Sequence, residues 1–307
     1  MGVSGMVRVT KRWVPVFCLL LISWHLACHQ AAESQSDTGG QSEAPRTTQT
    51  SQASQEVVAL GEIHTLNSTA LGERRQLNIY FPPGYGEKPD AKYPVIYLLD
   101  GAVHEDYHHV TGLVQFLVTY NLMPQSIVVG IANVDRYRDF TYPSQVAEDK
   151  EALPTSGGSE AFRRFLAEEL KPMIDREFPT DGTDTLIGQS LGGLLAAEIF
   201  IKTPDLFDHY MIVSPSFWWD GGKLLDAMPA ALDKLGEEKK TVYVALGSEG
   251  PEMQAGVDRF LVMLKAGAPK NLTWHFESLP KETHATILHR ALYRGFEVIY
   301  GETYKGM

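Results

Sequence analysis

Near its middle the chain carries a serine set among glycines, with Gly-Gln-Ser-Leu-Gly-Gly at residues 188–193. The motif follows an apolar run at 185–187 and precedes the small-residue run 194–197, so a predicted strand and a predicted helix flank it. Strand, sharp turn and helix, with serine at the turn, form a nucleophile elbow. Glycines fit such a turn because the serine backbone is strained and neighbouring segments pass close to it. We therefore predict that Ser190 is a nucleophile; the alternative is a glycine-rich turn in which Ser190 only caps the helix.

Apolar, β-branched runs alternate with segments of helical spacing along the rest of the chain. We predict strands at 76–81, 93–99, 126–132, 183–187, 209–213, 241–246 and 272–276. We predict helices at 162–174, 191–201, 223–235, 253–266 and 286–299. Strands that alternate with helices favour a mostly parallel sheet covered by helices on both faces. The predicted fold class is therefore α/β, with one α/β-hydrolase domain over residues 57–307.

A serine hydroxyl becomes a good nucleophile only when a base removes its proton. In α/β hydrolases the partners follow in the order Ser, acid, His. The histidines after Ser190 are His209, His275, His284 and His289. The first two fall in predicted strands and the last in a predicted helix. Only His284 lies in the loop between the last strand and the last helix, where this fold places its base, so we predict that it is the general base.

The acid that orients His284 is expected after the strand at 241–246. Glu249 is the first carboxylate there, Glu252 lies three residues further on, and Asp220 follows the preceding strand. We favour Glu249. The other two carboxylates, and a Ser–His dyad without an acid, remain alternatives.

An oxyanion hole needs two preorganised backbone N–H groups. One is expected from Leu191, directly after the nucleophile. The other is expected from the loop that follows an early strand, at residues 98–102.

The formal net charge is −11, from 27 Lys and Arg against 38 Asp and Glu, and no basic cluster occurs in the body of the chain. Binding of phosphate backbones needs clustered positive charge, so a nucleic-acid partner is disfavoured. Both cysteines, Cys18 and Cys28, lie near the N-terminus. The body therefore has no disulfide, no cysteine-based metal site and no catalytic thiol. We expect neither a metal nor a cofactor.

The N-terminal segment is typical of an export signal. Basic residues at 8, 11 and 12 precede the apolar run 14–24, which is shorter than the roughly 20 residues that span a bilayer. We predict a signal peptide over 1–27; the alternative is an N-terminal helix that packs on the domain. Residues 28–56 are rich in Ser, Gln and Thr with few aliphatic side chains, which predicts a disordered tether.

Cys28 follows Leu26-Ala27 at the end of the apolar run, and this sequence resembles the lipobox of bacterial lipoproteins, although His25 departs from it. We predict that Cys28 is lipidated, with simple cleavage nearby as the alternative. The protein would then be exported as a periplasmic or cell-envelope lipoprotein, held at the membrane only through its lipid.

Taken together, these motifs resemble the Putative esterase family of α/β hydrolases, which includes periplasmic siderophore esterases and mycobacterial mycolyltransferases. The matching segments span nearly the whole domain and are 97–101, 133–141, 157–178, the Ser190 elbow, 214–219, 247–249 and the His284 loop. The resemblance implies an α/β-hydrolase fold and hydrolysis of a small carboxylic ester through an acyl-enzyme on Ser190. It also implies that the Ala102 N–H is the second oxyanion donor.

The substrate is expected to be a siderophore-type lactone, because Ser-Pro-Ser-Phe-Trp-Trp at 214–219 is most similar to siderophore esterases. The chain departs from those relatives at 141–143, where Tyr interrupts Thr-Pro, and at 285–286, where Ala-Thr replaces a common Gly-Ser. Acyl transfer to a sugar or lipid acceptor, and hydrolysis of carbohydrate or general esters, remain alternatives because they use the same acyl-enzyme.

Four residues are predicted to contact the substrate. Trp218 and Trp219 follow a strand at the carboxyl edge of the sheet, where open α/β sheets bind ligands. Arg136 and Arg138 follow another strand at that edge and could pair with an anionic catecholate or carboxylate. In the alternative interpretation, the tryptophans pack in the core and Arg138 bridges a loop acid such as Asp139.

Two other classes of protein fit single features of the chain. The sequence His-Glu-Asp-Tyr-His at 104–108 matches the H-E-x-x-H signature of zinc proteases. Such a motif needs a buried helix and a third ligand, whereas here His104, Glu105 and His108 directly follow a strand in a very polar stretch. A non-catalytic binding lipoprotein is the other class, and the Ser190–His284 pairing argues against it.

Overall fold

A computed structural model describes residues 59–304 of the chain, with side chains up to 301. All of these residues belong to one compact unit. The predicted signal peptide (1–27), the tether (28–56) and the lipidated Cys28 lie outside the described residues. Within 59–304, no helix is both long enough and apolar enough to cross a bilayer.

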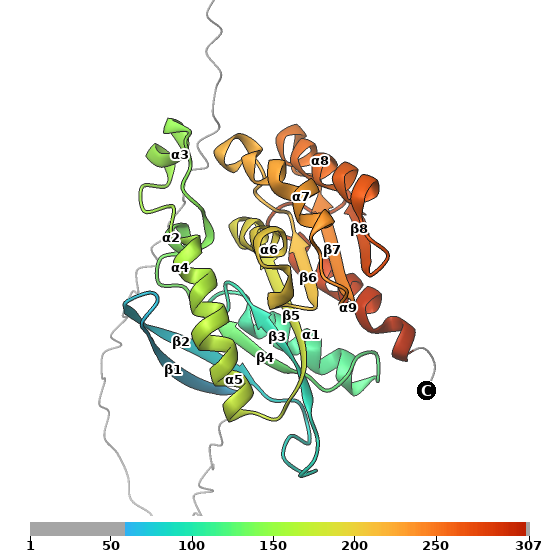
Figure 1. Ribbon diagram of the computed structural model, residues 1–307. Coiled ribbons are helices and arrows are strands. Elements are labelled where there is room, and N and C mark those ends of the chain that lie inside the picture. The colour runs from blue at the N-terminus through green and yellow to red at the C-terminus, as the bar shows by residue number, and fades with distance from the viewer. Residues whose placement is uncertain (1–58, 305–307) are drawn as a thin grey trace, which may run out of the picture. The chain divides into compact units, whose positions relative to one another are not determined.

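The described strands form a single sheet in the order β1-β2-β4-β3-β5-β6-β7-β8 (Figure 1). β1 and β2 are antiparallel to each other, β2 is antiparallel to β4, and all other neighbours are parallel. The strands are β1 Glu62–Ser68, β2 Glu73–Tyr80, β3 Tyr93–Leu98, β4 Ile127–Ile131, β5 Thr180–Gln189, β6 His209–Val213, β7 Lys240–Gly247 and β8 Leu272–Leu279. Because the parallel strands share one direction, the loops after them meet at one edge of the sheet.

Helices cover both faces of the sheet (Figure 1). They are α1 Tyr107–Thr119, α2 Arg136–Phe140, α3 Ala147–Ala152, α4 Ser159–Arg164, α5 Lys171–Glu177, α6 Leu191–Lys202, α7 Met228–Asp233, α8 Pro251–Gly267 and α9 Ile287–Tyr304. α1 and α9 pack on one face, whereas α4 to α8 pack on the other. A π-helical stretch, Phe165–Leu170, joins α4 to α5.

The central strand β3 shows why this sheet is buried on both sides. Successive side chains of a strand point to opposite faces. Val95 and Tyr97 accordingly join the core under α4 to α8, and Ile96 and Leu98 join the core under α1 and α9. All four are almost completely buried. The predicted fold class, a single α/β domain with a mostly parallel central sheet, is confirmed.

One predicted helix differs from the structure. Residues 223–235 form no continuous helix: a 3₁₀ segment, Trp219–Ala227, precedes α7. Positive φ angles at Asp220, Gly221 and Gly222 bend the chain within this segment, and Pro229 lies in the first turn of α7. Proline favours a helix start because it lacks the N–H that would bond to the preceding turn.

Candidate active site

Ser190 lies on the turn between β5 and α6, with φ 60° and ψ −119°, a conformation that non-glycine residues rarely adopt. Its N–H donates to Val213 O at 3.0 Å. A Cβ on Gly188 would lie 2.2 Å from Gly192 O, and one on Gly193 would lie 2.8 Å from Val213 O. The glycines are therefore required by close backbone packing, and this packing holds Ser190 at the tip of the turn.

His284 and Glu249 are brought together by the loops that follow β8 and β7. His284 Nδ1 lies 2.5 Å from Glu249 Oε2. The Glu249 side chain is 2% exposed and that of His284 is 46% exposed. The two loops are also joined directly, because Ser248 N–H donates to Glu282 O at 2.8 Å. A buried carboxylate thus holds a more accessible imidazole, which is the arrangement that orients a general base.

The Glu249 carboxylate is kept ionised by its neighbours. Its Oε1 accepts hydrogen bonds from Ser214 Oγ at 2.5 Å and from the Gly247 N–H at 3.1 Å. Burial raises the pKa of Glu249, but the hydrogen bonds from His284 and Ser214 outweigh burial and hold the pKa below the ordinary glutamate value.

The two alternative acids do not contact His284. Asp220 accepts hydrogen bonds from Gln145 N–H at 2.6 Å and from Ser144 Oγ at 3.2 Å, so it fixes a different loop. Glu252 is exposed in the first turn of α8. Of the three carboxylates considered from sequence, only Glu249 is placed to orient His284.

Ser190 Oγ lies 3.4 Å from Ser216 Oγ. Among the described residues, Ser190 and His284 share no direct hydrogen bond. Their backbones are linked through Gln189, whose Nε2 donates to His284 O at 2.5 Å. Catalytic hydrogen bonds commonly shorten only when substrate is bound. Gln189 was missed from sequence because a residue inside the elbow motif carries no signal about a partner 95 positions away.

The two predicted oxyanion donors lie at the same edge of the sheet. Leu191 is the first residue of α6, so its N–H has no acceptor within the helix. Ala102 follows β3 by way of Asp100, which has φ 54°, and Gly101. A Cβ on Gly192 would lie 3.4 Å from Asp100 Oδ2, so the loop that carries Ala102 packs directly against the start of α6.

Arg136 does not point its guanidinium at open solvent. Its Nε and Nη2 donate to the two Asp100 oxygens at 2.6 and 2.9 Å, and Nη2 also donates to Gln189 O at 3.3 Å. Burial raises the pKa of Asp100, although the hydrogen bonds from Arg136 and Asn133 act in the opposite direction. Arg136 therefore joins the Ala102 loop to the residue before Ser190. Its predicted substrate contact stays a prediction.

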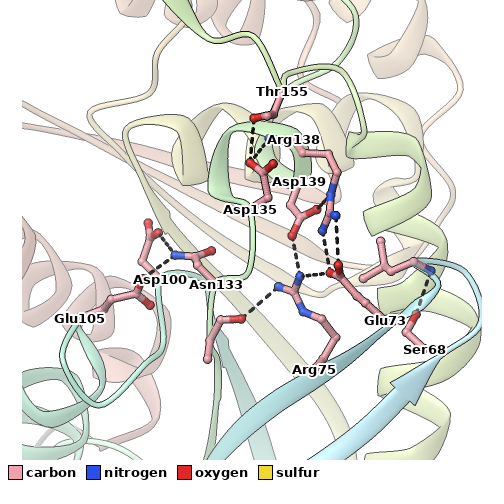
Figure 2. A network of polar contacts seen from close by, with 12 residues as sticks. Ser68, Glu73, Arg75, Asp100, Glu105, Asn133, Asp135, Arg138, Asp139 and Thr155 are labelled. Atoms are coloured by element: carbon pink, nitrogen blue, oxygen red, sulfur yellow. Dashed lines mark hydrogen bonds and ion pairs between the residues drawn. The ribbon is translucent and has the colours of Figure 1, made fainter.

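Arg138 belongs to an ion-pair network on β2 and α2 rather than to the elbow (Figure 2). Its Nε donates to Asp139 at 2.7 Å, and its two terminal nitrogens donate to Glu73 at 3.0 and 2.6 Å. Arg75, fully buried, completes the network by donating to Asp139 at 2.6 Å. These pairs give Arg138 a structural role, and its predicted substrate contact stays a prediction.

Trp219 is likewise a core residue. Its side chain is 0% exposed, and its Nε1–H donates to Tyr142 O at 2.8 Å. It therefore presents no surface to a substrate, and the expected contact is corrected. Trp218 is partly exposed and packs against the same core, so its predicted contact remains open.

The H-E-x-x-H match does not form a metal-binding helix. α1 begins only at Tyr107, so His104 and Glu105 precede it, and both His104 and His108 are exposed. Glu105 instead accepts hydrogen bonds from the Ala102 N–H at 2.9 Å and from Asn133 Nδ2 at 2.8 Å. The side chains of His104, Glu105 and His108 therefore do not converge on one metal position.

Comparison with known proteins places this geometry among esterases. Residues 68–285 match the model of the family described as Putative esterase. The ferri-bacillibactin esterase BesA of Bacillus subtilis is 33% identical over 165 residues, which cover 48% of this chain and 56% of BesA. The siderophore enterobactin esterase of Emericella nidulans is 38% identical over 72 residues, 22% of this chain and 24% of that protein.

Solved structures extend the similarity over most of the described domain. An IroE-like serine hydrolase from Shewanella oneidensis superposes with a TM-score of 0.72 and 28% identity, covering 79% of this chain and 80% of the other. The BES protein from Bacillus cereus gives a TM-score of 0.71 and 27% identity, covering 81% and 99%. The chain spans little more than half the length of the curated relative BesA.

Proposed function

The chain belongs to the Putative esterase family, and from that premise we propose that it is a serine hydrolase of carboxylic esters that acts on siderophore-type lactones. The observation that carries the proposal is the contact between His284 Nδ1 and the buried Glu249 carboxylate, 2.5 Å apart, at the sheet edge that carries the strained Ser190. A base oriented in this way at the same sheet edge as a partly buried serine turn supports acyl transfer through a covalent intermediate.

In the proposed mechanism, Ser190 Oγ attacks the ester carbonyl while His284 Nε2 accepts the hydroxyl proton. Glu249 holds the opposite ring nitrogen and stabilises the imidazolium that forms. The carbonyl oxygen becomes negatively charged and is stabilised by the Leu191 and Ala102 N–H groups. The tetrahedral intermediate expels the alcohol, which takes the proton from His284. Water then attacks the acyl-Ser190 carbonyl, with the same residues in the same roles, and releases the acid.

The substrate class rests on the relatives. BesA is named a ferri-bacillibactin esterase, the Emericella nidulans relative an enterobactin esterase, and a third relative from Escherichia coli an iron(III) salmochelin esterase. We infer a siderophore lactone as the substrate of this chain. Two apolar side chains that flank Arg136 in sequence, Val134 at 57% exposure and Tyr137 at 44%, offer surface for the aromatic parts of such a molecule.

The test compares Ser190→Ala and His284→Ala with wild type on p-nitrophenyl butyrate and on a siderophore trilactone. Each variant should lose at least about 10³-fold in kcat, and the double variant should be little worse than either, because the residues act as a unit. His275→Ala is the control, since His275 lies on β8 and contacts Glu277 instead of the site. Full activity in Ser190→Ala contradicts the mechanism. Equal kcat/KM on both esters contradicts the substrate class.

We further propose that residues 1–27 direct export and that Cys28 is acylated, so that the enzyme stands off a membrane on residues 28–56. The support is the basic and apolar pattern of the sequence followed by Leu-Ala-Cys. Stable anchoring needs two or more acyl chains. Cys28→Ser should move the protein from the membrane fraction to the soluble fraction. A soluble wild-type protein with a free N-terminus near Ala31 contradicts lipidation.

A further inference from the structure

Three backbone N–H groups after β3 have hydrogen-bond acceptors. Leu99 N–H donates to Ile187 O and Gly101 N–H donates to Ile131 O, both at 3.0 Å, so the sheet holds them. The next one, Ala102 N–H, donates to a side chain: it bonds to Glu105 Oε2 at 2.9 Å. A carboxylate oxygen therefore occupies the N–H that would receive the carbonyl oxygen of an ester.

Glu105 is anchored in this position. Its other oxygen accepts a hydrogen bond from Asn133 Nδ2 at 2.8 Å, and the same nitrogen donates to Asp100 Oδ1 at 2.6 Å. Figure 2 shows Glu105 and Asp100 both bonded to Asn133. Asn133 Nδ2 thus donates one hydrogen bond to Glu105 and one to Asp100, which holds both carboxylates at the start of the Ala102 loop.

One N–H cannot donate fully to two anions in the same direction. The tetrahedral intermediate carries its negative charge on the oxygen that needs Ala102. Glu105 presents a negative oxygen to the same hydrogen, so it mimics that oxyanion and repels it. The two states exclude each other, and Glu105 must rotate away before Ala102 can stabilise the reaction.

We propose that Glu105 is a gate on the oxyanion hole, closed in this structure and opened when a substrate displaces its carboxylate from the Ala102 N–H. This inference rests on the proposed function, because it assigns a regulation to the same site. The gate favours esters that bind strongly enough to displace Glu105, and it holds back the hydrolysis of small esters that make few other contacts.

A structural role for the same contact predicts the opposite sign. Ala102 O accepts the Glu105 N–H at 2.9 Å while Glu105 Oε2 accepts the Ala102 N–H, so Glu105 closes the turn before α1 with both its backbone and its side chain. If the contact served only to stabilise the turn before α1, its removal would disorder the Ala102 loop and lower activity. The direction of the change in activity therefore separates a gate from a cap.

The experiment measures kcat/KM of the full chain on p-nitrophenyl butyrate in wild type, Glu105→Ala and Glu105→Gln. Glu105→Gln keeps the size of the side chain, removes its charge and replaces one of its two acceptor oxygens by an NH2 donor, so it serves if Glu105→Ala does not fold. Glu169→Gln is the matched control, because Glu169 Oε1 also accepts backbone N–H groups, from Thr69 at 2.9 Å and Ala70 at 2.8 Å, away from the site.

We expect both Glu105 variants to gain at least about threefold, and no more than the roughly 10²–10³-fold that one oxyanion donor contributes. Affinity for n-butylboronic acid should tighten by a similar factor. Ser190 Oγ adds to its boron, the serine proton passes to His284, and the negatively charged tetrahedral boronate presents a hydroxyl oxygen to the same N–H. Glu169→Gln should match wild type in both measurements.

Activity and boronate affinity at or below wild type in both Glu105 variants would overturn the gate. A wild-type protein with neither esterase activity nor boronate binding would overturn the proposed function itself, and with it the gate. The two failures are therefore distinguishable by the behaviour of wild type.

Discussion

Arg136 donates two hydrogen bonds to Asp100, at 2.6 and 2.9 Å, and through Asp100 it positions the loop that carries Ala102. Asp100 needs such a partner because its φ of 54° is a strained conformation for a non-glycine residue. The third contact of Arg136, to Gln189 O, reaches the residue before Ser190. One guanidinium thus connects the segments that supply both oxyanion donors.

Replacement of Arg136 by Met or Lys should lower kcat on neutral and anionic esters alike, by about 10-fold or more, because the oxyanion donors lose alignment. The measurement is kcat and KM on p-nitrophenyl butyrate and on a catecholate lactone. Arg164→Met, at an arginine whose side chain is 57% exposed, is the control. A rise in KM confined to the anionic ester would instead assign Arg136 to binding the substrate charge.

Gly188→Ala should unfold or inactivate the protein, since the new Cβ would lie 2.2 Å from Gly192 O and backbone atoms cannot move aside cheaply. Gly112→Ala is the matched control in α1, where nothing lies within 4 Å of the added Cβ. That change should be neutral or stabilise by about 0.5–1 kcal/mol, because alanine favours helix. Urea unfolding and esterase activity check both. A Gly188→Ala protein with wild-type stability would contradict the tight elbow.

Arg75→Met should destabilise the fold by about 2–4 kcal/mol, because it removes one partner from the fully buried Asp139. Arg138 still pairs with Asp139 at 2.7 Å, which keeps the loss below complete unfolding. The free energy of unfolding in urea gives the measurement. Arg164→Met removes an exposed i,i+4 pair with Glu168 and should change stability by less than about 0.5 kcal/mol. Equal effects of the two substitutions would contradict the network.

Acid should destabilise the protein through His209. Burial lowers the pKa of His209 below its ordinary value of 6.5. As the pH falls below 6.5, the unfolded chain takes up a proton that the folded chain resists, so the free energy of unfolding falls until the folded pKa is passed. Thermal unfolding between pH 8 and about pH 5 should therefore show a steeper loss in wild type than in His209→Phe. His104→Phe, at an exposed histidine, should retain the wild-type slope.

Local sequence predicts the parts of the site that local geometry determines. The glycine spacing around Ser190 indicates a tight turn in which a side chain larger than glycine would clash with nearby backbone. The position of His284 follows from the order of strands and helices. Glu249 could be ranked first among three acids but not chosen, because the choice depends on two loops that meet only in the folded chain.

What the sequence could not predict comes from contacts between distant segments. Arg138 resembles a substrate ligand from its position after β4, and nothing near it in the sequence indicates that it pairs with Glu73, 65 residues away on β2. From its position after β6, Trp219 is expected at the edge of the sheet. In the folded chain it is buried in the core, where it donates a hydrogen bond to Tyr142, 77 residues away. The strand β1 was not predicted because its face is polar and largely exposed, which gives no apolar alternation to detect.

The most direct test of the account is covalent labelling of the nucleophile. Diethyl p-nitrophenyl phosphate should phosphorylate Ser190 and release p-nitrophenol, giving a stable adduct because His284 cannot activate water against it efficiently. Mass spectrometry should find one diethylphosphoryl group on the peptide that contains Ser190, rising in parallel with the loss of esterase activity, and none in Ser190→Ala. Esterase activity that persists while Ser190 is fully labelled, or that is lost with the label on another residue, would contradict the account.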